Sequence, residues 1–182
     1  MELTPTLWRT CRVLAGPTRL ELLRRIIESS EPCVSELTKA VRISETRASQ
    51  ELRRLQSRGL VQAAREGRWV RYRPAPDPKV PSAKPLLAAA RASLARRSAM
   101  ETIRVAKAFG HERRLKMVRL LQDGVRRGEE LQFLAGLSRS ALFRHLDVLK
   151  AGGVVRRSGN RWELAPNVHP LAKAVEALLK KA

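Results

Sequence analysis

An internal repeat constrains the fold of this 182-residue chain more than any other feature of its sequence. Three segments recur in the same order at offsets of 95, 94 and 90 residues: 14–26 with 109–121, 44–61 with 138–155, and 72–76 with 162–166. The second of these matches pairs Leu52 with Leu146 and Gly59 with Gly153. The offset changes only in the intervening turns, where deletions are tolerated. The pattern therefore predicts one structural unit that is used twice.

Both copies predict the same coarse order of helices and strands. Pro17 suits a first helical turn, Ser44 a helix N-cap and Gly59 a left-handed helix end. The elements expected in the first copy are a helix from Pro17, a helix over about 33–41, a helix between Ser44 and Gly59, and strands near 60–65 and 69–73 joined by a turn at Glu66-Gly67. The elements expected in the second copy are helices near 112–123, 128–135 and 139–151, and strands near 153–157 and 161–164. This order is that of a winged helix-turn-helix.

The segment that joins the copies is itself helical in pattern. Residues 81–110 are rich in Ala, Leu and Arg, and the stretch between Pro85 and Gly110 contains no Gly or Pro. It predicts either one long helix, roughly 36 Å if it runs from 86 to 109, or two abutting helices. The expected organisation is an N-terminal unit over 1–81, a connecting and dimerisation-like helical segment over 82–110, and a C-terminal unit over 111–182. The predicted fold is mainly α with small β-hairpin wings, in which the two units have a pseudo-two-fold arrangement and pack through the N-terminal, connecting and C-terminal helices.

A strong positive charge narrows the possible partners. The chain has 37 Lys and Arg against 17 Asp and Glu, a formal net charge of +20. The excess is spread over the chain, at +7 in 1–81, +5 in 82–110 and +8 in 111–182, so no basic tail explains it. Such a chain attracts polyanions. The alternative is a basic solvated surface with no nucleic-acid partner.

Three sequence segments of the first copy carry a family resemblance. At LAGPTRLELL (14–23), followed by EPCVSEL (31–37) and a run that ends in RGLV (58–61), the chain resembles the ArsR/SmtB family of winged-helix repressors. The resemblance covers nearly the whole chain twice, although the second copy is more divergent, with His111-Glu112 where Pro-Thr is usual. It implies a transcription regulator that binds double-stranded DNA. Members are generally homodimers joined by their terminal helices, so the tandem chain resembles a fused pseudo-dimer, and further homo-oligomerisation stays open.

The candidate DNA-binding residues lie on the third helix and the wing of each copy. In this docking mode the N-terminal half of the third helix enters the major groove. The helix candidates are Glu45, Thr46, Ser49, Gln50 and Arg53, with the counterparts Arg139, Ser140, Phe143, Arg144 and Asp147. The wing candidates are Arg65, Arg68, Arg71 and Arg73 in the first copy and Arg156, Arg157 and Arg161 in the second. Gln50 suits adenine and Arg144 suits guanine, although the helix residues could also be merely the polar face of an amphipathic helix.

Cysteine and histidine usage argues against a metal site. Metal-sensing relatives carry a Cys-Val-Cys-Asp-Leu type segment, whereas this chain has Cys33-Val34-Ser35-Glu36-Leu37. Soft metals need two or three thiolates, so we expect Cys33 to be a small buried hydrophobe and Cys11 a core residue. His111, His145 and His169 lack the helical spacing of a metal cage, and we expect them to be surface or capping residues. The sequence therefore predicts no metal and no cofactor.

Other classes of protein fit the sequence less well. It has no phosphate loop and no nucleophile elbow, so we do not expect an enzyme. A tandem winged-helix scaffold that binds protein is the main alternative, and RNA binding lacks the exposed aromatics needed for base stacking. Two cysteines suit a reducing cytoplasm, the first residues lack the regions of a signal peptide, and no apolar run nears the ~20 residues of a membrane span. We expect a cytoplasmic protein without a membrane partner.

Overall fold

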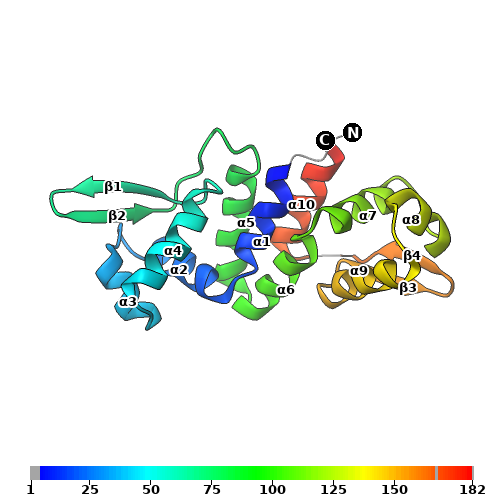
Figure 1. Ribbon diagram of the computed structural model, residues 1–182, viewed down its shortest axis with the longest axis horizontal. Coiled ribbons are helices and arrows are strands. Elements are labelled where there is room, and N and C mark those ends of the chain that lie inside the picture. The colour runs from blue at the N-terminus through cyan, green and yellow to red at the C-terminus, as the bar shows by residue number, and fades with distance from the viewer. Residues whose placement is uncertain (1–4, 167, 182) are drawn as a thin grey trace.

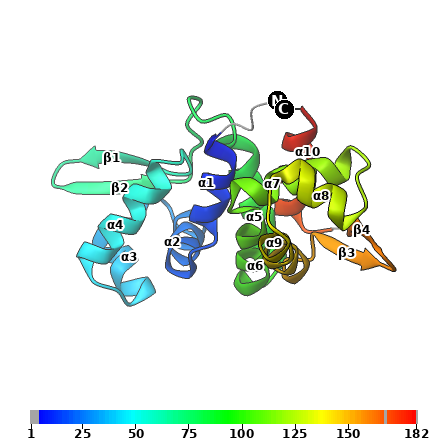
Figure 2. The same cartoon turned by 45° about the vertical axis from the view of Figure 1, so that its right-hand side comes forward.

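A central layer of helices with a helix-turn-helix body at each end forms the molecule, as Figures 1 and 2 show. The computed structural model describes residues 5–166 and 168–181. Residues 1–4, 167 and 182, which belong to the two units expected from the sequence, lie outside the described residues. The helices of the central layer are α1 (Pro5–Leu14), α5 (Ala83–Arg96), α6 (Ala99–Phe109) and α10 (Pro170–Lys181). The start of α1 and the end of α10 lie on the same side of this layer.

The two end bodies have the same element order. The N-terminal body contains α2 (Pro17–Glu28), α3 (Val34–Val41), α4 (Glu45–Gln56), β1 (Gln62–Glu66) and β2 (Trp69–Arg73). The C-terminal body contains α7 (Glu112–Gln122), α8 (Gly128–Ala135), α9 (Arg139–Ala151), β3 (Val155–Ser158) and β4 (Arg161–Leu164). Each pair of strands is an antiparallel hairpin with no third strand in its sheet among the described residues. The predicted fold class, mainly α with two winged helix-turn-helix units, is confirmed.

Matching capping residues fix the third helix of each body. The Ser44 hydroxyl accepts a hydrogen bond from the Arg47 backbone N–H, and the Ser138 hydroxyl accepts one from Ala141. The helix end is also repeated. Gly59 and Gly153 adopt φ values of +65° and +66°, a left-handed conformation that costs little only for glycine. These signals explain why the expected positions of both third helices agree with the structure to within a residue at the N-terminal end.

The central helices pack in the reciprocal pairs that a pseudo-two-fold arrangement requires. By position in the repeat, α1 corresponds to α6 and α5 corresponds to α10. The corresponding helices contact each other, α1 against α6 and α5 against α10. The cross-contacts are reciprocal too, since α2 packs on α6 while α7 packs on α1. The chain therefore packs against itself as two identical subunits of a symmetric dimer would.

The connecting segment holds two helices, so of the two arrangements that the sequence left open the single long helix is wrong. Helix α5 ends at Arg96, Arg97 is extended, and Ser98 begins α6 by accepting a hydrogen bond from the Glu101 backbone N–H. The Arg97 guanidinium also pairs with the Glu101 carboxylate at 3.0 Å. A capping residue inside the segment therefore ends one helix and begins the next.

Buried side chains from both copies form one continuous core. Leu7, Cys11 and Leu14 of α1 are buried in it, and so are Ala48, Leu52 and Leu55 of α4. Tyr72 and Trp162, which occupy equivalent positions in the two wings, are each only 7% exposed. None of the helices in the described parts of the chain combines the length and the apolar character that crossing a membrane requires.

The hairpin register corrects two details expected from the sequence. Glu66 pairs with Trp69, so the first turn is Gly67-Arg68 instead of Glu66-Gly67. The first strand of each hairpin also begins two residues later than expected, because the preceding residues pack in the core; Leu60 and Val61 are 0% and 2% exposed. Beyond the equivalent pairs Ala63–Tyr72 and Arg157–Trp162, the first hairpin has two more residue pairs than the second. The first wing therefore extends about 7 Å further, at roughly 3.3 Å per residue.

Candidate nucleic-acid interface

The outer face of α4 presents most of its sequence-predicted residues to solvent. Glu45, Thr46, Gln50 and Arg53 are exposed, and Ser49 is half-buried. The opposite face of the helix is anchored in the core, which leaves the candidate face free. Sequence reasoning missed Arg47, an exposed residue at the same end of the helix whose Nη2 donates to the Thr18 hydroxyl at 3.2 Å. The sequence signal that could have identified Arg47 is its position, because it is a basic residue three positions after the N-cap Ser44.

The equivalent face of α9 differs in chemistry. All five of its candidates, Arg139, Ser140, Phe143, Arg144 and Asp147, are exposed. The Phe143 ring is 41% exposed, and the neighbouring helix α8 adds Phe133 at 83% and Leu134 at 39%. These exposed aromatic residues have no counterparts in the N-terminal unit, where the positions equivalent to Phe133 and Phe143 are Lys39 and Ser49. The two third helices therefore offer different surfaces on the same scaffold.

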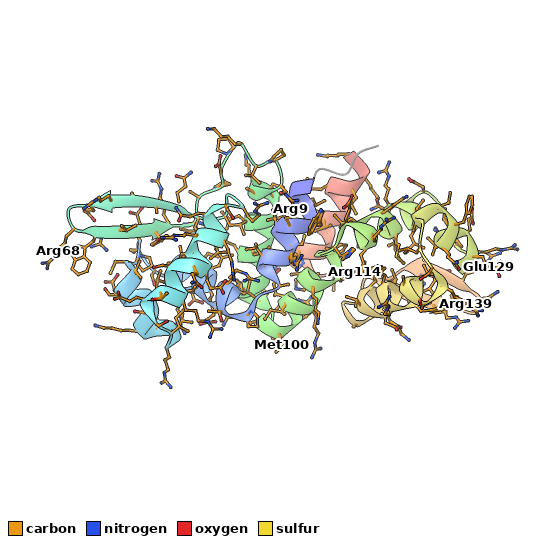
Figure 3. All side chains as sticks on the ribbon, viewed as in Figure 1. Arg9, Arg68, Met100, Arg114, Glu129 and Arg139 are labelled. Atoms are coloured by element: carbon orange, nitrogen blue, oxygen red, sulfur yellow. The ribbon has the colours of Figure 1, made fainter. Side chains whose placement is uncertain are left out.

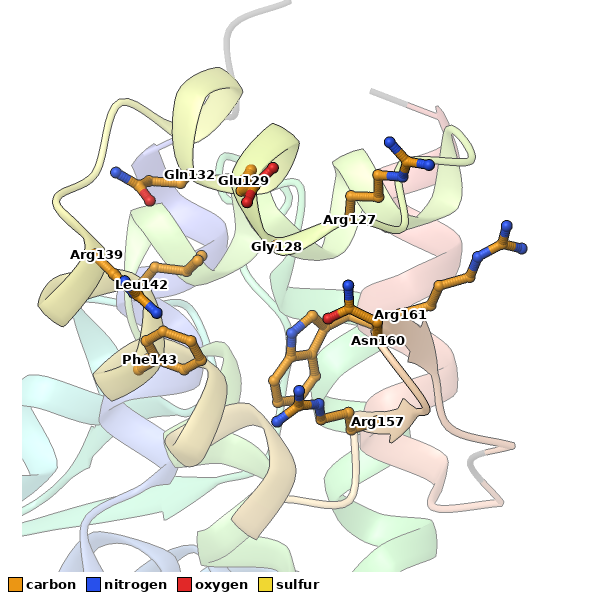
Figure 4. Close-up of a pocket in the computed structure, with 11 residues that line it drawn as sticks. Arg127, Gly128, Glu129, Gln132, Arg139, Leu142, Phe143, Arg157, Asn160 and Arg161 are labelled. Carbon is orange, nitrogen blue, oxygen red and sulfur yellow. The ribbon is translucent and has the colours of Figure 1, made fainter.

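Four of the predicted residues come together in a cavity of about 660 Å³ between α8, α9 and the second hairpin. Figure 4 shows Arg139 and Phe143 on one side of it, and Arg157 and Arg161 on the other. The lining also includes Arg127, the N-cap of α8, and Gln132 within that helix, and sequence reasoning missed both. The basic residue at the start of α8 was visible in the sequence, but its distance from the hairpin depends on the fold.

In the first wing, Arg68 lies at the tip, whereas Arg71 is held by hydrogen bonds within the protein. Arg68 lies in the two-residue turn, at the far end of the molecule from Arg139 (Figure 3). Its guanidinium stacks on the Trp69 ring, 4.9 Å from the centroid. Arg71 instead binds the Glu66 carboxylate at 2.5 Å and the Glu31 carbonyl at 3.1 Å. Arg68 is thus free to contact phosphates, whereas Arg71 is held inside the wing.

The second wing repeats this division. Arg156 pairs with Glu163 at 3.1 Å. Arg157 makes only a backbone contact among its described hydrogen bonds, donating from Nε to the Gly159 carbonyl at 3.0 Å. Arg161 forms a backbone bridge with Arg127, the equivalent of the bridge between Arg71 and Cys33. Arg157 and Arg161 therefore keep their charge available, while that of Arg156 is partly neutralised.

An ion pair behind α4 is replaced by a histidine pair behind α9. Arg19 binds Glu51 at 2.8 Å. Burial alone raises the pKa of Glu51, but the hydrogen bond and charge of Arg19 outweigh it and leave that pKa below its ordinary value. In the C-terminal unit the equivalent residues are Arg114 and His145, and the His145 ring lies 4.8 Å from His111. Burial lowers the pKa of both histidines, and the surrounding positive charges lower it further.

The cysteines lie apart from any cluster of metal ligands. The Cys33 sulfur contacts the Ser35 hydroxyl at 3.1 Å, and its backbone N–H donates to the Glu36 carboxylate at 2.7 Å. Burial raises the pKa of Cys11 to about 12. Within residues 5–166 and 168–181, no three His, Cys, Asp or Glu side chains come together in a way that could hold a metal ion.

His111 and His169 act as helix caps. The His111 ring accepts a hydrogen bond from the Arg113 backbone N–H at the start of α7, and the buried His169 ring accepts one from Leu171 at the start of α10. The expectation that histidines serve as surface or capping residues therefore agrees with their positions. His145 is half-buried on α9.

Comparison with known proteins finds the same module in both copies. A family model described as "Bacterial regulatory protein, arsR family" matches residues 16–63 and again 111–157. The chain is 37% identical over 75 residues to the arsenic resistance transcriptional regulator ArsR1 of Pseudomonas putida, over 41% of this chain and 57% of that protein. It is 42% identical over 62 residues to the putative arsenical resistance operon repressor ArsR2 of Halobacterium salinarum, over 34% of this chain and 52% of that protein.

A third relative matches to a similar extent. The arsenical resistance operon repressor of Escherichia coli is 35% identical over 65 residues, over 36% of this chain and 56% of that protein. The chain thus spans little more than half the length of each of these relatives. No solved structure gives a significant match.

Proposed function

Because this chain belongs to the arsR family of bacterial regulatory proteins, we propose that it is a transcription repressor that binds double-stranded DNA with both of its helix-turn-helix bodies. The observation that supports this most strongly is the duplication: the family model matches twice in one chain. The reciprocal packing of α1 on α6 and of α5 on α10 gives one chain the two-fold plan of a dimer. A net charge of +20 supplies long-range attraction to the phosphate backbone.

Each body contributes a third helix and a wing to the proposed interface. The exposed N-terminal halves of α4 and α9 enter successive major grooves, where Gln50 reads adenine and Arg144 reads guanine. Arg68 and Arg157 anchor the wings on phosphates. Two such helices fit half-sites about 10 base pairs apart on one face of the duplex. Because Gln50 and Arg144 are different readers at equivalent positions, the operator is an imperfect palindrome or none at all.

The names of the three relatives refer to arsenic or arsenical resistance, but this chain lacks the residues that a response to arsenic requires. Cys33 is the one thiol at the start of α3, its neighbour two residues on is Ser35, and the equivalent of Cys33 in the second copy is Arg127. Soft metals and arsenite need two or three thiolates. We therefore propose a regulator whose DNA binding does not respond to these ions.

The exposed apolar residues Phe133, Leu134 and Phe143 favour a second candidate function. Exposed apolar side chains of this kind on a helix-turn-helix body suit contact with protein, as in a chromosome-associated scaffold. In that case the C-terminal unit binds a protein partner and the N-terminal unit alone holds DNA. The two candidate functions predict different results for substitutions on α9. These substitutions alter the base preference of DNA binding only if the C-terminal unit also reads DNA.

A salt-dependent mobility shift tests the proposal. First, DNA fragments of the parent genome that bind the full chain are isolated and sequenced. The affinity of the chain for the selected duplex is then compared with its affinity for single-stranded RNA, between roughly 50 and 200 mM salt. We expect duplex binding that weakens steeply with salt, because each phosphate that the protein neutralises contributes about 0.9 to the slope. Equal affinity for the RNA, or retention of fragments without a common motif, would contradict sequence-specific DNA binding.

A further inference from the structure

A groove lined by arginines separates α1 from the end of α4 in the N-terminal unit. Its volume is about 460 Å³, within the range of small-molecule sites. The lining, which we call the arginine groove, consists of Trp8, Arg9, Arg12, Val13, Arg19, Arg54, Ser57 and Arg58. Arg9 projects from α1 near the middle of the molecule (Figure 3).

The charge of the arginine groove is mostly uncompensated. Five of its lining residues are arginines, and the carboxylate that contacts them is Glu51, bound by Arg19 at 2.8 Å and Arg54 at 3.0 Å. Within the described residues, Arg9, Arg12 and Arg58 have no ion pair. Guanidinium groups bind phosphate and carboxylate in a bidentate geometry. The groove is therefore suited to an anion with more than one charge.

Several side chains of the groove are held in place before any ligand arrives. Arg19 donates from Nε to the Val13 carbonyl at 2.7 Å and from Nη1 to the Glu51 carboxylate at 2.8 Å. The Arg9 guanidinium lies over the Trp8 ring, 5.2 Å from its centroid. Preorganised donors lose less entropy when they bind. The Trp8 ring and Val13 add an apolar wall, which suits a ligand with an apolar part beside its charges.

The second copy shows that the fold does not require this charge. The equivalents of Arg9 and Arg12 are Arg104 and Lys107, but Arg54, Ser57 and Arg58 correspond to Val148, Ala151 and Gly152. The matching groove is smaller, about 330 Å³, and lined by Arg104, Lys107, Val148 and Ala151. A Cβ atom at Gly152 would lie 2.6 Å from the Cβ of Ala108. Glycine thus brings α9 close to α6, whereas Arg58 stands at the same position in the N-terminal unit.

The arginine groove lies away from most of the proposed DNA contacts. The α4 residues that we propose to enter the major groove are in its first half, whereas Arg54 lies in the last turn, next to the candidate Arg53, and Arg58 follows the helix. One end of α4 (Glu45–Gln56) is about 16 Å from the other at 1.5 Å per residue. The groove joins α4 to α1, and α1 packs on α6 of the other unit.

We propose that the arginine groove is a binding site for a small polyanion that carries at least two phosphate or carboxylate groups, and that the bound ligand changes DNA affinity. The ligand bridges Arg9 and Arg12 of α1 with Arg54 and Arg58 of α4. It thereby fixes the third helix of the N-terminal unit relative to the central layer. The site itself is independent of the proposed function, whereas the effect on DNA rests on it.

Calorimetric titration of the full chain tests the site with two probes, inorganic pyrophosphate and citrate, at matched ionic strength. Two variants remove opposite walls: Arg9→Ala with Arg12→Ala, and Arg54→Val with Ser57→Ala and Arg58→Gly, which copies the lining of the second unit. The matched control is Arg104→Ala with Lys107→Ala, which removes two positive charges from the equivalent positions on α6. Thermal unfolding by circular dichroism confirms that all variants are folded.

We expect one site per chain, binding at least 10-fold weaker in both groove variants, and a change of less than twofold in the control. Tighter binding of pyrophosphate than of citrate identifies the ligand as a phosphate compound, and the reverse order identifies a polycarboxylate. An equal loss in the control, or no saturable binding of either probe, overturns the proposal, because the attraction would then be that of the whole basic surface.

The regulatory step is measured separately. The mobility shift is repeated with the stronger probe at saturation, for the wild-type chain and for the variant with the second-unit lining. We expect a change in DNA affinity of at least threefold in the wild type and none in the variant. Saturable binding with unchanged DNA affinity in both overturns the regulatory step. Absence of DNA binding by the unliganded and the liganded chain overturns the proposed function and leaves the calorimetric result on the site intact.

Discussion

The N-terminal and C-terminal units place the same third helix against different neighbours. In the N-terminal unit Glu51 ties α4 to Arg19, and Arg58 stands at the groove between α4 and α1. In the C-terminal unit the equivalent residues are His145 and Gly152. There α9 packs directly on α6, and a histidine stands in place of the ion-paired carboxylate. The apolar residues facing the core are kept in both copies, so the duplication preserved the fold and let the surroundings of the third helix diverge.

The two wings differ in reach as well as in charge. Beyond Tyr72 and Trp162 the first hairpin extends two residue pairs further than the second, and it carries Arg68 and Trp69 at its tip. The shorter second hairpin closes over a cavity lined by Arg139, Phe143 and Arg157. A long wing with a cationic tip is suited to a phosphate or minor-groove contact at a distance. If both units bind DNA as we propose, their footprints are unequal, and substitutions at equivalent positions should have unequal effects.

The largest effect expected is on stability, from Gly152→Ala. The Gly152 backbone φ of −84° suits alanine, but the added methyl would lie 2.6 Å from the Cβ of Ala108. Overpacking of this kind costs about 1–3 kcal/mol. The measurement is urea unfolding followed by far-UV circular dichroism. The matched control is Arg58→Ala at the equivalent position, for which we expect a change within about 0.5 kcal/mol. Equal midpoints for the two variants would show that α9 and α6 do not pack closely.

The next effect is on base preference. Arg144→Ala should cost about 1–3 kcal/mol of DNA affinity and relax preference at one base in one half-site. Gln50→Ala should act by a similar mechanism on the other half-site, with adenine as the base concerned. Competition of each variant against a library of single-base operator changes separates the two. If Arg144→Ala leaves every base preference unchanged while Gln50→Ala alters one, α9 is not a reader, and the scaffold function of the C-terminal unit gains support.

Much of this asymmetry was not predictable from the sequence, although the fold was. Pro17, Ser44, Ser138, Gly59 and Gly153 are local signals, and each acts where it was expected to act. Ser98 was also a local signal, because a serine three residues before Glu101 is typical of a helix start. Reading it would have divided the connecting segment correctly.

The grooves and ion pairs depend on contacts between distant segments. Whether α9 approaches α6 is decided by Gly152 and Ala108, which are far apart in sequence and gave no spacing pattern. The pairing of Arg71 with Glu66 depends on hairpin register, which the sequence placed one residue away from the observed turn. The candidate residues on α4, α9 and the wings stay predictions, and their exposure agrees with that role.

The wings provide the third test of the comparison. Arg68→Ala and Arg157→Ala should weaken binding to all duplex sequences alike, and each should flatten the dependence of log affinity on log salt by about one unit. The control is Arg156→Ala, whose guanidinium already pairs with Glu163 at 3.1 Å and should change the slope less. Affinities are measured over a salt series. A sequence-dependent loss for Arg68→Ala would place this residue on a base edge.

The fourth test concerns acid stability. The pKa values of His111 and His145 are lowered in the folded chain, first by burial and then by nearby positive charge. The unfolded chain therefore binds protons more readily, and stability falls as the pH drops below the ordinary histidine pKa of about 6.5. His145→Glu restores the carboxylate of the first copy opposite Arg114. We expect its urea midpoint to fall less than that of the wild type between about pH 7.5 and 5.5. An identical fall would assign the acid sensitivity to other groups, His169 among them.

For thiophilic ions we expect no effect on DNA affinity. The start of α3 offers one sulfur atom, that of Cys33, and the equivalent place in the second copy is occupied by Arg127. The other thiol, Cys11, is buried, with its pKa raised to about 12, so it forms a thiolate reluctantly. Titration with zinc, cadmium and arsenite followed by the mobility shift should leave DNA affinity unchanged, for the wild type and for Cys33→Ser alike. Stoichiometric binding that releases DNA and is lost in Cys33→Ser would contradict the prediction, because further ligands would then complete a site at Cys33.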